Sequence, residues 1–347
     1  MLPYAPIQYN ILPDCKTPVF LAPSKQFKVP SGYGWKGTLF HFLNARNVRV
    51  RIIFSVRNKG GYVPFYHQSL LSQLTESLLV DKPLLLSANE YNFSGLKGQT
   101  KVSKNGLHFY SSRATLVFAS ASRELIDAFL QKLFEQKEIE IGTLQLVPES
   151  VEQEILPRFG DELKCVCISP IVAIDPAGNE LHAKKFIMPD SDAFSDFLYE
   201  STMMRMEKSG RYTPEQIAGF YKFQIIPDKA YLEKIKDGDK KFARIYPVQS
   251  GDEFLEVRGY TFPFALYSAV EVQEFIFECG LGFFAHKGFG MVDVIHADSA
   301  RRTEPYPYEG QSVAGGGFGK HTINGHAMNG HAANGQLSLN RRQENAI

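Results

Sequence analysis

Hydrophobic and polar residues alternate most regularly over NVRVRIIFSV, residues 47–56. The apolar series is Val48, Val50, Ile52, Phe54 and Val56. Arg49 and Arg51 stand between these positions. A period of two predicts a β-strand with one apolar face and one largely polar, partly basic face. The polar face must therefore contact something other than a hydrophobic core.

In the segments that follow, the spacing of apolar residues alternates between that of a helix and that of a strand. Leucines at helical spacing in HQSLLSQLTESLL predict one helix, and SRELIDAFLQKLF predicts a second with Ser122 as its N-cap. Two strands joined by a lysine-bearing turn lie between these helices, and EIEIGTLQLV predicts a closing strand. The order βαββαβ is that of the ferredoxin-like motif.

A looser version of this order follows in the second half of the chain. It begins with a strand at LKCVCISPIVAI and ends with a helix at SAVEVQEFIFE, a glycine-rich loop and a strand at MVDVI. The predicted class is α+β, with two tandem ferredoxin-like (βαββαβ) domains and a C-terminal Gly-rich loop. The expected segments are an N-terminal extension (1–45), domain 1 (46–150), domain 2 with the loop (151–299) and a disordered tail (300–347), which is of low complexity.

Composition narrows the class of protein further. The 347 residues are 44% hydrophobic with a formal net charge of +1, which indicates a globular protein and neither demands nor excludes a polyanionic partner. Four scattered cysteines predict neither a disulfide framework nor a zinc site. Neither a secretion signal nor a membrane-spanning apolar stretch is recognisable, so we expect a cytoplasmic protein with no membrane partner.

The glycine-rich loop GLGFFAHKGFG, residues 280–290, contains two G-x-G pairs. It follows a helix and precedes a strand, which is the reverse of a dinucleotide fingerprint, and Lys287 is not followed by Ser or Thr as in a nucleotide-triphosphate loop. We therefore expect no nucleotide cofactor. No metal site is expected either, although His321, His326 and His331 of the tail leave adventitious metal binding open.

In its tandem organisation and its loop, the chain resembles the CRISPR repeat-processing endoribonucleases, family six of the CRISPR-associated proteins (Cas6) in the RAMP superfamily. The similar segments are VPFYHQSLLSQL, YNFSGLKG, CISPIVA and ECGLGFFAHKGFGMVDVI, within residues 47–297. The resemblance implies a part in CRISPR RNA maturation for antiviral defence, with CRISPR repeat RNA and other effector-complex subunits as partners. It also implies metal-independent cleavage, in which the 2′-hydroxyl attacks the phosphate and leaves 2′,3′-cyclic phosphate and 5′-hydroxyl ends.

RNA contacts are expected from bare loop backbone and from basic side chains. The candidates are Gly280, Gly282, His286, Lys287, Gly288, Gly290, Arg49, Arg51, Lys101 and Lys104. Glycines let backbone N–H groups approach a sugar-phosphate chain closely, and lysine and arginine neutralise phosphates. The alternative for the loop is a tight turn that glycine makes possible.

Cleavage needs a base for the 2′-hydroxyl, an acid for the leaving oxygen and charge stabilisation. Many family members carry a catalytic histidine between the first helix and the next strand, and LLVDKPLLLSANEY has none. The catalytic candidates are then His67 beside Tyr66, His286 and Lys97. The missing histidine favours the alternative of a non-catalytic subunit that binds repeat RNA.

Overall fold

The computed structural model describes residues 48–83, 86, 89–175, 187–237, 242–250, 253–295 and 302–307. The chain divides after Arg46 into two units, and every described residue belongs to the second. The predicted N-terminal extension and most of the predicted tail, with its three histidines, lie outside the described residues.

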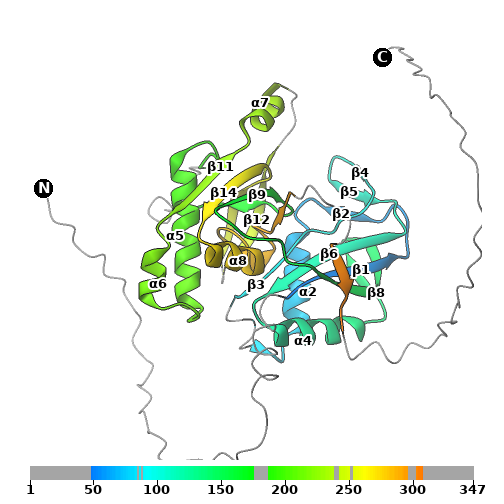
Figure 1. Cartoon of the computed structure of the whole chain (residues 1–347). Helices are drawn as coiled ribbons and strands as arrows, with labels where there is room; N and C mark the ends of the chain where they lie inside the picture. The colour runs from blue at the N-terminus through cyan, green and yellow to red at the C-terminus, as the bar shows by residue number, and fades with distance from the viewer. Residues whose placement is uncertain are drawn as a thin grey trace, which may run out of the picture. The chain divides into compact units, whose positions relative to one another are not determined.

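The first half is built on an antiparallel sheet with β1 (Val48–Val56) in its interior (Figure 1). The other members are β3 (Tyr91–Phe93), β6 (Arg113–Ser120), β7 (Ile139–Ile141), β8 (Leu144–Glu154) and β16 (Thr303–Pro305). Four of these strands stand in the order β8-β1-β6-β3, which is fourth, first, third and second along the chain. Helix α2 (Gln68–Leu78) follows the first of them and α4 (Arg123–Phe134) the third, as a ferredoxin-like βαββαβ unit requires.

Both helices pack on the apolar face of this sheet. The predicted apolar series of β1 is buried where its side chains are described, in one core with the apolar stripe of α4, including Phe129. Phe129 stacks on Phe118 of β6 with ring centroids 4.2 Å apart. The Ser122 hydroxyl accepts a hydrogen bond from the Leu125 amide at 3.2 Å, which confirms the predicted N-cap.

A small antiparallel sheet lies beside the first one, in the order β2 (Tyr62–Pro64), β5 (Gly106–Phe109) and β4 (Thr100–Val102). Strands β4 and β5 form a hairpin, and every residue of β4 is exposed. This hairpin carries the predicted lysine-bearing turn.

The second half repeats the same strand order with additions. Its sheet runs β15 (Val292–Val294), β9 (Glu162–Cys167), β14 (Pro263–Ser268) and β11 (Phe223–Pro227), again fourth, first, third and second. Helices α5 (Asp192–Lys208) and α8 (Val270–Cys279) follow the first and third strands. The α+β class and the two tandem ferredoxin-like units are thus confirmed.

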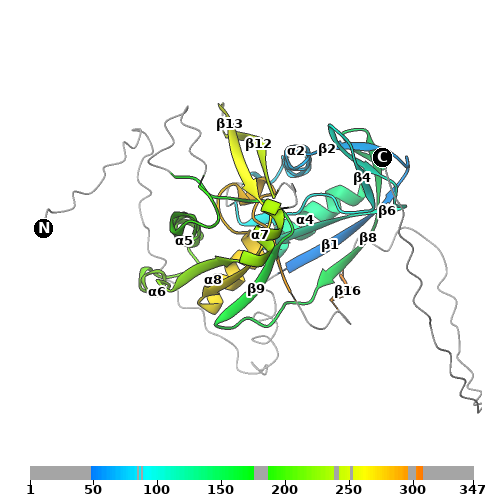
Figure 2. The same ribbon diagram turned by 90° about the horizontal axis from the view of Figure 1, so that it is seen from above.

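The additions explain why the second half has a looser pattern in sequence. They are α6 (Pro214–Gly219), α7 (Lys229–Asp237) and a three-stranded sheet of β10 (Ile171–Val172), β13 (Glu253–Tyr260) and β12 (Ala243–Ser250) (Figure 2). In the described part of the chain, no helix is long and apolar enough to cross a membrane.

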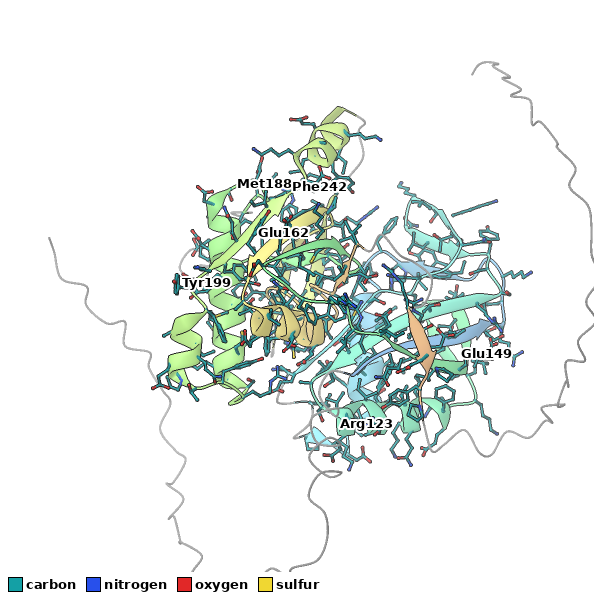
Figure 3. The ribbon with its side chains drawn as sticks, viewed as in Figure 1. Arg123, Glu149, Glu162, Met188, Tyr199 and Phe242 are labelled. Atoms are coloured by element: carbon teal, nitrogen blue, oxygen red, sulfur yellow. The ribbon has the colours of Figure 1, made fainter. Side chains whose placement is uncertain are left out.

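The start of the predicted disordered tail forms ordered structure, so that prediction is wrong for residues 302–307. Strand β16 pairs with β8, and Tyr306 is 2% exposed. The Tyr306 hydroxyl donates to Asp127 Oδ1 at 2.6 Å, and Arg123, labelled in Figure 3, lies 5.3 Å from the centre of its ring. Backbone groups at the edge of β8 are free to pair with this short segment. Burial of the Tyr306 ring also stabilises the segment on the first half.

Candidate nucleic-acid interface

The Gly-rich loop connects α8 to β15 and contains the short 3-10 helix η1 (Ala285–Lys287). Gly280, Gly282, Gly288 and Gly290 are buried and have φ between +69° and +85°. L-residues with a side chain rarely adopt this left-handed region, so the backbone path itself requires glycine.

Close packing is a second reason for these glycines. A Cβ on Gly290 would lie 1.8 Å from the Leu281 carbonyl oxygen, and one on Gly280 would lie 1.7 Å from Asn92 Nδ2. A Cβ on Gly288 would lie 2.3 Å from the ring of Phe93. Asn92 and Phe93 belong to β3, so the loop packs against the first half.

The loop also uses its backbone groups internally. The Leu281 amide donates to the Gly290 carbonyl at 2.8 Å, and the Gly290 amide donates to the Pro170 carbonyl at 2.7 Å. These contacts argue against the expectation that the glycines expose bare backbone to RNA. Their φ angles and their close contacts account for them, which is the tight-turn alternative.

His286 and Lys287 of η1 are half-buried beside α2. The His286 ring meets the ring of Tyr91 edge-on, with centroids 6.4 Å apart. Burial lowers the pKa of His286 to about 4, and the positive charges of Lys287 and Arg205 add to the effect. At neutral pH His286 is uncharged, so it adds no positive charge for RNA.

Lys287 forms an ion pair with Glu76 of α2, with 2.6 Å between Nζ and Oε1. Burial alone would raise the pKa of Glu76, but hydrogen bonds from Lys287 and Ser72 outweigh it and hold the pKa below its ordinary value. The pair lies at a small pocket between α2, β12 and the loop. The pocket lining is Ser69, Ser72, Gln73, Glu76, Pro247, Val248, Gln249, Lys287 and Phe289.

His67 is buried at the start of α2, and both of its ring nitrogens bond to backbone. Nδ1 donates to the Pro64 carbonyl at 2.9 Å, and Nε2 accepts from the Leu96 amide at 3.0 Å. Burial lowers the pKa of His67 and favours this neutral tautomer. With both nitrogens occupied, the geometry of His67 matches local hydrogen bonding better than catalysis.

Tyr66 and Lys97, the other catalytic candidates, retain contact with solvent. Tyr66 is 47% exposed. The backbone of Lys97 bridges to Thr115 of β6, with 2.9 Å between the Lys97 amide and the Thr115 carbonyl. Desolvation of its amine and the neighbouring charge of Arg49 lower the pKa of Lys97. Tyr66 and Lys97 are therefore accessible to RNA, whereas His67 is buried.

Arg49 is 2% exposed, which argues against the expected contact with RNA. Its Nε lies 2.7 Å from Glu154 Oε2, and one terminal nitrogen donates to the Val292 carbonyl at 2.8 Å. Its guanidinium also lies 4.2 Å from the ring centroid of Phe277. The polar face of β1 therefore packs against the second half, and Arg51, at 32% exposure, shares Glu154 with Arg49.

Lys101 and Lys104 are exposed on the β4–β5 hairpin. The Lys101 amine lies 4.9 Å from the ring centroid of Tyr110. Neither lysine is ion-paired with a carboxylate of the described residues. Of the basic side chains expected to contact RNA, these two are the most accessible.

Sequence reasoning missed Glu76 and Glu154, which hold Lys287 and Arg49. Each is one of many acidic residues, and nothing local distinguishes it. The informative signal was indirect: a strand with arginines on one face needs a buried counter-charge if another domain covers that face.

Known proteins give independent evidence on this fold. The family model described as "CRISPR associated protein Cas6, C-terminal" matches residues 151–294. The predicted resemblance to the Cas6 family is thereby confirmed. No curated protein matches the sequence.

The fold is shared with several solved structures. One, described as "Characterization of a Cas6-related gene from Pyrococcus furiosus", has a TM-score of 0.58 at 20% identity and covers 73% of this chain and 100% of that chain. A second, described as "An RAMP protein binding different RNA substrates", has a TM-score of 0.58 at 22% identity and covers 72% and 100%. A third, described as "CRISPR associated protein Cas6", has a TM-score of 0.54 at 17% identity and covers 72% and 100%.

Proposed function

We propose that this chain, whose residues 151–294 match the Cas6 C-terminal family model, binds CRISPR repeat RNA during CRISPR RNA maturation. The observation that carries the proposal is the family match. The accessible lysines of the β4–β5 hairpin agree with it, because residues 97–110 contain Lys97, Lys101 and Lys104 and no acidic residue. Such a surface attracts a phosphate chain.

The two histidines expected as catalytic candidates, His67 and His286, favour binding over cleavage. A general base works best with a pKa near the working pH. The pKa of His286 is far below that range, and His67 is occupied on both nitrogens. A protein of this kind would hold repeat RNA as a subunit of a larger CRISPR complex.

A metal-independent endoribonuclease is the second candidate, and the match to the Cas6 family model supports it. In this reaction the 2′-oxygen bonds to phosphorus while the bond from phosphorus to the 5′-oxygen breaks. A base takes the 2′-hydroxyl proton, and an acid protonates the leaving oxygen. Of the two candidate histidines, His286 is the better placed for this role, because both nitrogens of His67 bond to backbone. Tyr66 and Lys97 are the remaining candidates.

One assay separates the two functions. Labelled repeat RNA is incubated with the protein in EDTA, and both the mobility shift and the RNA ends are analysed. We expect a shifted but intact RNA, and a scrambled RNA of equal length should bind more weakly. Absence of any shift would refute the binding proposal.

Cleavage that leaves a 2′,3′-cyclic phosphate would instead establish the second candidate. The variants His286→Gln, Lys97→Ala and Tyr66→Phe then assign its groups. Each must retain the wild-type melting temperature, because His286 also packs on Tyr91.

A further inference from the structure

The small sheet of β2, β5 and β4 carries a row of side chains in register across its three strands. Tyr62 of β2 lies directly opposite His108 of β5, and His108 lies directly opposite Lys101 of β4. Directly opposed residues point to the same face of a sheet. The rings of Tyr62 and His108 touch there, with centroids 5.4 Å apart.

Tyr110 extends this row on the same side, because it stands two positions after His108 on an extended chain. Its ring meets the Lys101 amine on one side, and its Cε1 lies 3.8 Å from the position that a Cβ on Gly60 would take. The ring is 46% exposed, whereas the adjacent Phe109 is fully buried. Phe109 therefore supplies the core contact of the hairpin, which leaves Tyr110 without that structural role.

His108 is held in a fixed orientation within this row. Its Nδ1 lies 3.0 Å from the Gly60 carbonyl, which can only accept, so Nδ1 carries the proton. In the neutral ring Nε2 is then an acceptor. A ribose 2′-hydroxyl or an exocyclic base amine is a donor suited to it.

The segments that carry the row hold charges of one sign. Residues 57–66 and 97–110 contain Arg57, Lys59, Lys97, Lys101 and Lys104 and no aspartate or glutamate. Aromatic rings interleaved with cations are the composition by which proteins hold single-stranded nucleic acid: bases stack on the rings, and phosphates contact the cations.

We propose that this aromatic face, defined as Tyr62, Lys101, His108 and Tyr110, stacks unpaired bases of the repeat RNA. The inference rests on the proposed function and adds the form of the ligand. Stacking on a side chain requires bases that are free of a duplex, because an A-form helix keeps its bases stacked inside. The segment bound at this face is therefore single-stranded.

The test measures the affinity of the full chain for two RNAs, a single-stranded repeat and the same repeat annealed to its complement. Tyr110→Ala should weaken single-strand binding by about 5- to 150-fold, as expected for the loss of one stacked base. Duplex binding should stay unchanged. Tyr110→Phe keeps the ring and should bind like the wild type.

Tyr221→Ala is the matched control, because Tyr221 is 70% exposed and lies outside this sheet. Unchanged single-strand affinity of Tyr110→Ala would overturn the aromatic face while leaving the proposed function standing. Equal weakening of both RNAs would also overturn it. A wild type that binds neither RNA would overturn both proposals together.

Discussion

The Gly-rich loop and the β4–β5 hairpin were both expected to contact RNA, but they differ in the structure. Each contains glycine and lysine, although only the loop is rich in glycine. The loop is packed between the two halves, with its glycines buried, while β4 is exposed along its whole length. Glycine in a loop therefore marks a close approach of backbone without saying whether the neighbour is a ligand or the protein itself.

The hydrogen bonds around the two segments explain the difference. The loop gives its amides to Pro170, Gly290 and Val172, and Asn92 donates to the Phe289 carbonyl at 2.8 Å. The outer strand of the hairpin pairs only with β5 in its sheet. The loop thus helps to join the two halves, and the hairpin is free to bind.

The largest effect that would test this contrast is expected from Gly290→Ala. The added Cβ would meet the Leu281 carbonyl, and φ of +69° would strain the new residue, so we expect a loss of roughly 3 to 4 kcal/mol in unfolding free energy. Gly210→Ala is the control, because Gly210 has φ of +65° but no atom within 4 Å of the added Cβ. Its cost should be about 1 kcal/mol, from strain alone. Equal midpoints in urea for the two variants would contradict a packed loop.

Arg49→Met is expected to cost about 3 kcal/mol, because it leaves the Glu154 carboxylate buried with one partner fewer. Adding Glu154→Gln removes that buried charge, so the double variant should be more stable than the single one. Arg113→Ala, which removes an exposed pair with Glu149, should leave the urea midpoint unchanged. If the double variant were less stable than Arg49→Met, the unpaired buried charge of Glu154 would not be the cause of the lost stability.

Acid should destabilise the loop through His286. Its folded pKa of about 4 lies below the ordinary 6.5, so the unfolded chain takes up a proton first as pH falls. Stability is nearly complete above pH 6.5 and should fall by roughly 3 kcal/mol by pH 4. His286→Gln should flatten this part of the pH profile of the melting temperature. His67, whose pKa is also lowered, should account for a remaining slope. An unchanged profile would show that His286 is not buried as described.

The smallest effect on folding, and a selective one on RNA, is expected from Lys101→Ala combined with Lys104→Ala. Both side chains are exposed, so the melting temperature should not change. The slope of log affinity against log salt should fall by about 1.4, since each phosphate contact on a single strand contributes about 0.7. Lys132→Ala on α4, whose side chain pairs with Asp81, is the control and should keep the slope. If the double variant kept the wild-type slope, the hairpin would not be part of the RNA interface.

Local pattern alone was enough to predict the fold. The alternation of residues 48–56, the apolar stripe and Ser122 cap of α4, and the βαββαβ order are properties of short segments. Period and capping depend on neighbours a few positions away, so one sequence contains them. The resemblance to Cas6 rested on the tandem order and on the segment that contains the Gly-rich loop.

The partners of the site residues were decided only by the tertiary structure. Arg49 and the carbonyl it contacts on Val292 are 243 positions apart, and the Gly-rich loop is explained by side chains of β3. From the sequence His67 was a catalytic candidate, but in the structure both of its ring nitrogens bond to backbone groups. Residues 302–307 were predicted as part of the tail, but the strand within them pairs with β8. The sequence by itself determined which faces are apolar or charged. What covers each face depends on how distant elements dock, and that is a matter of packing between the halves.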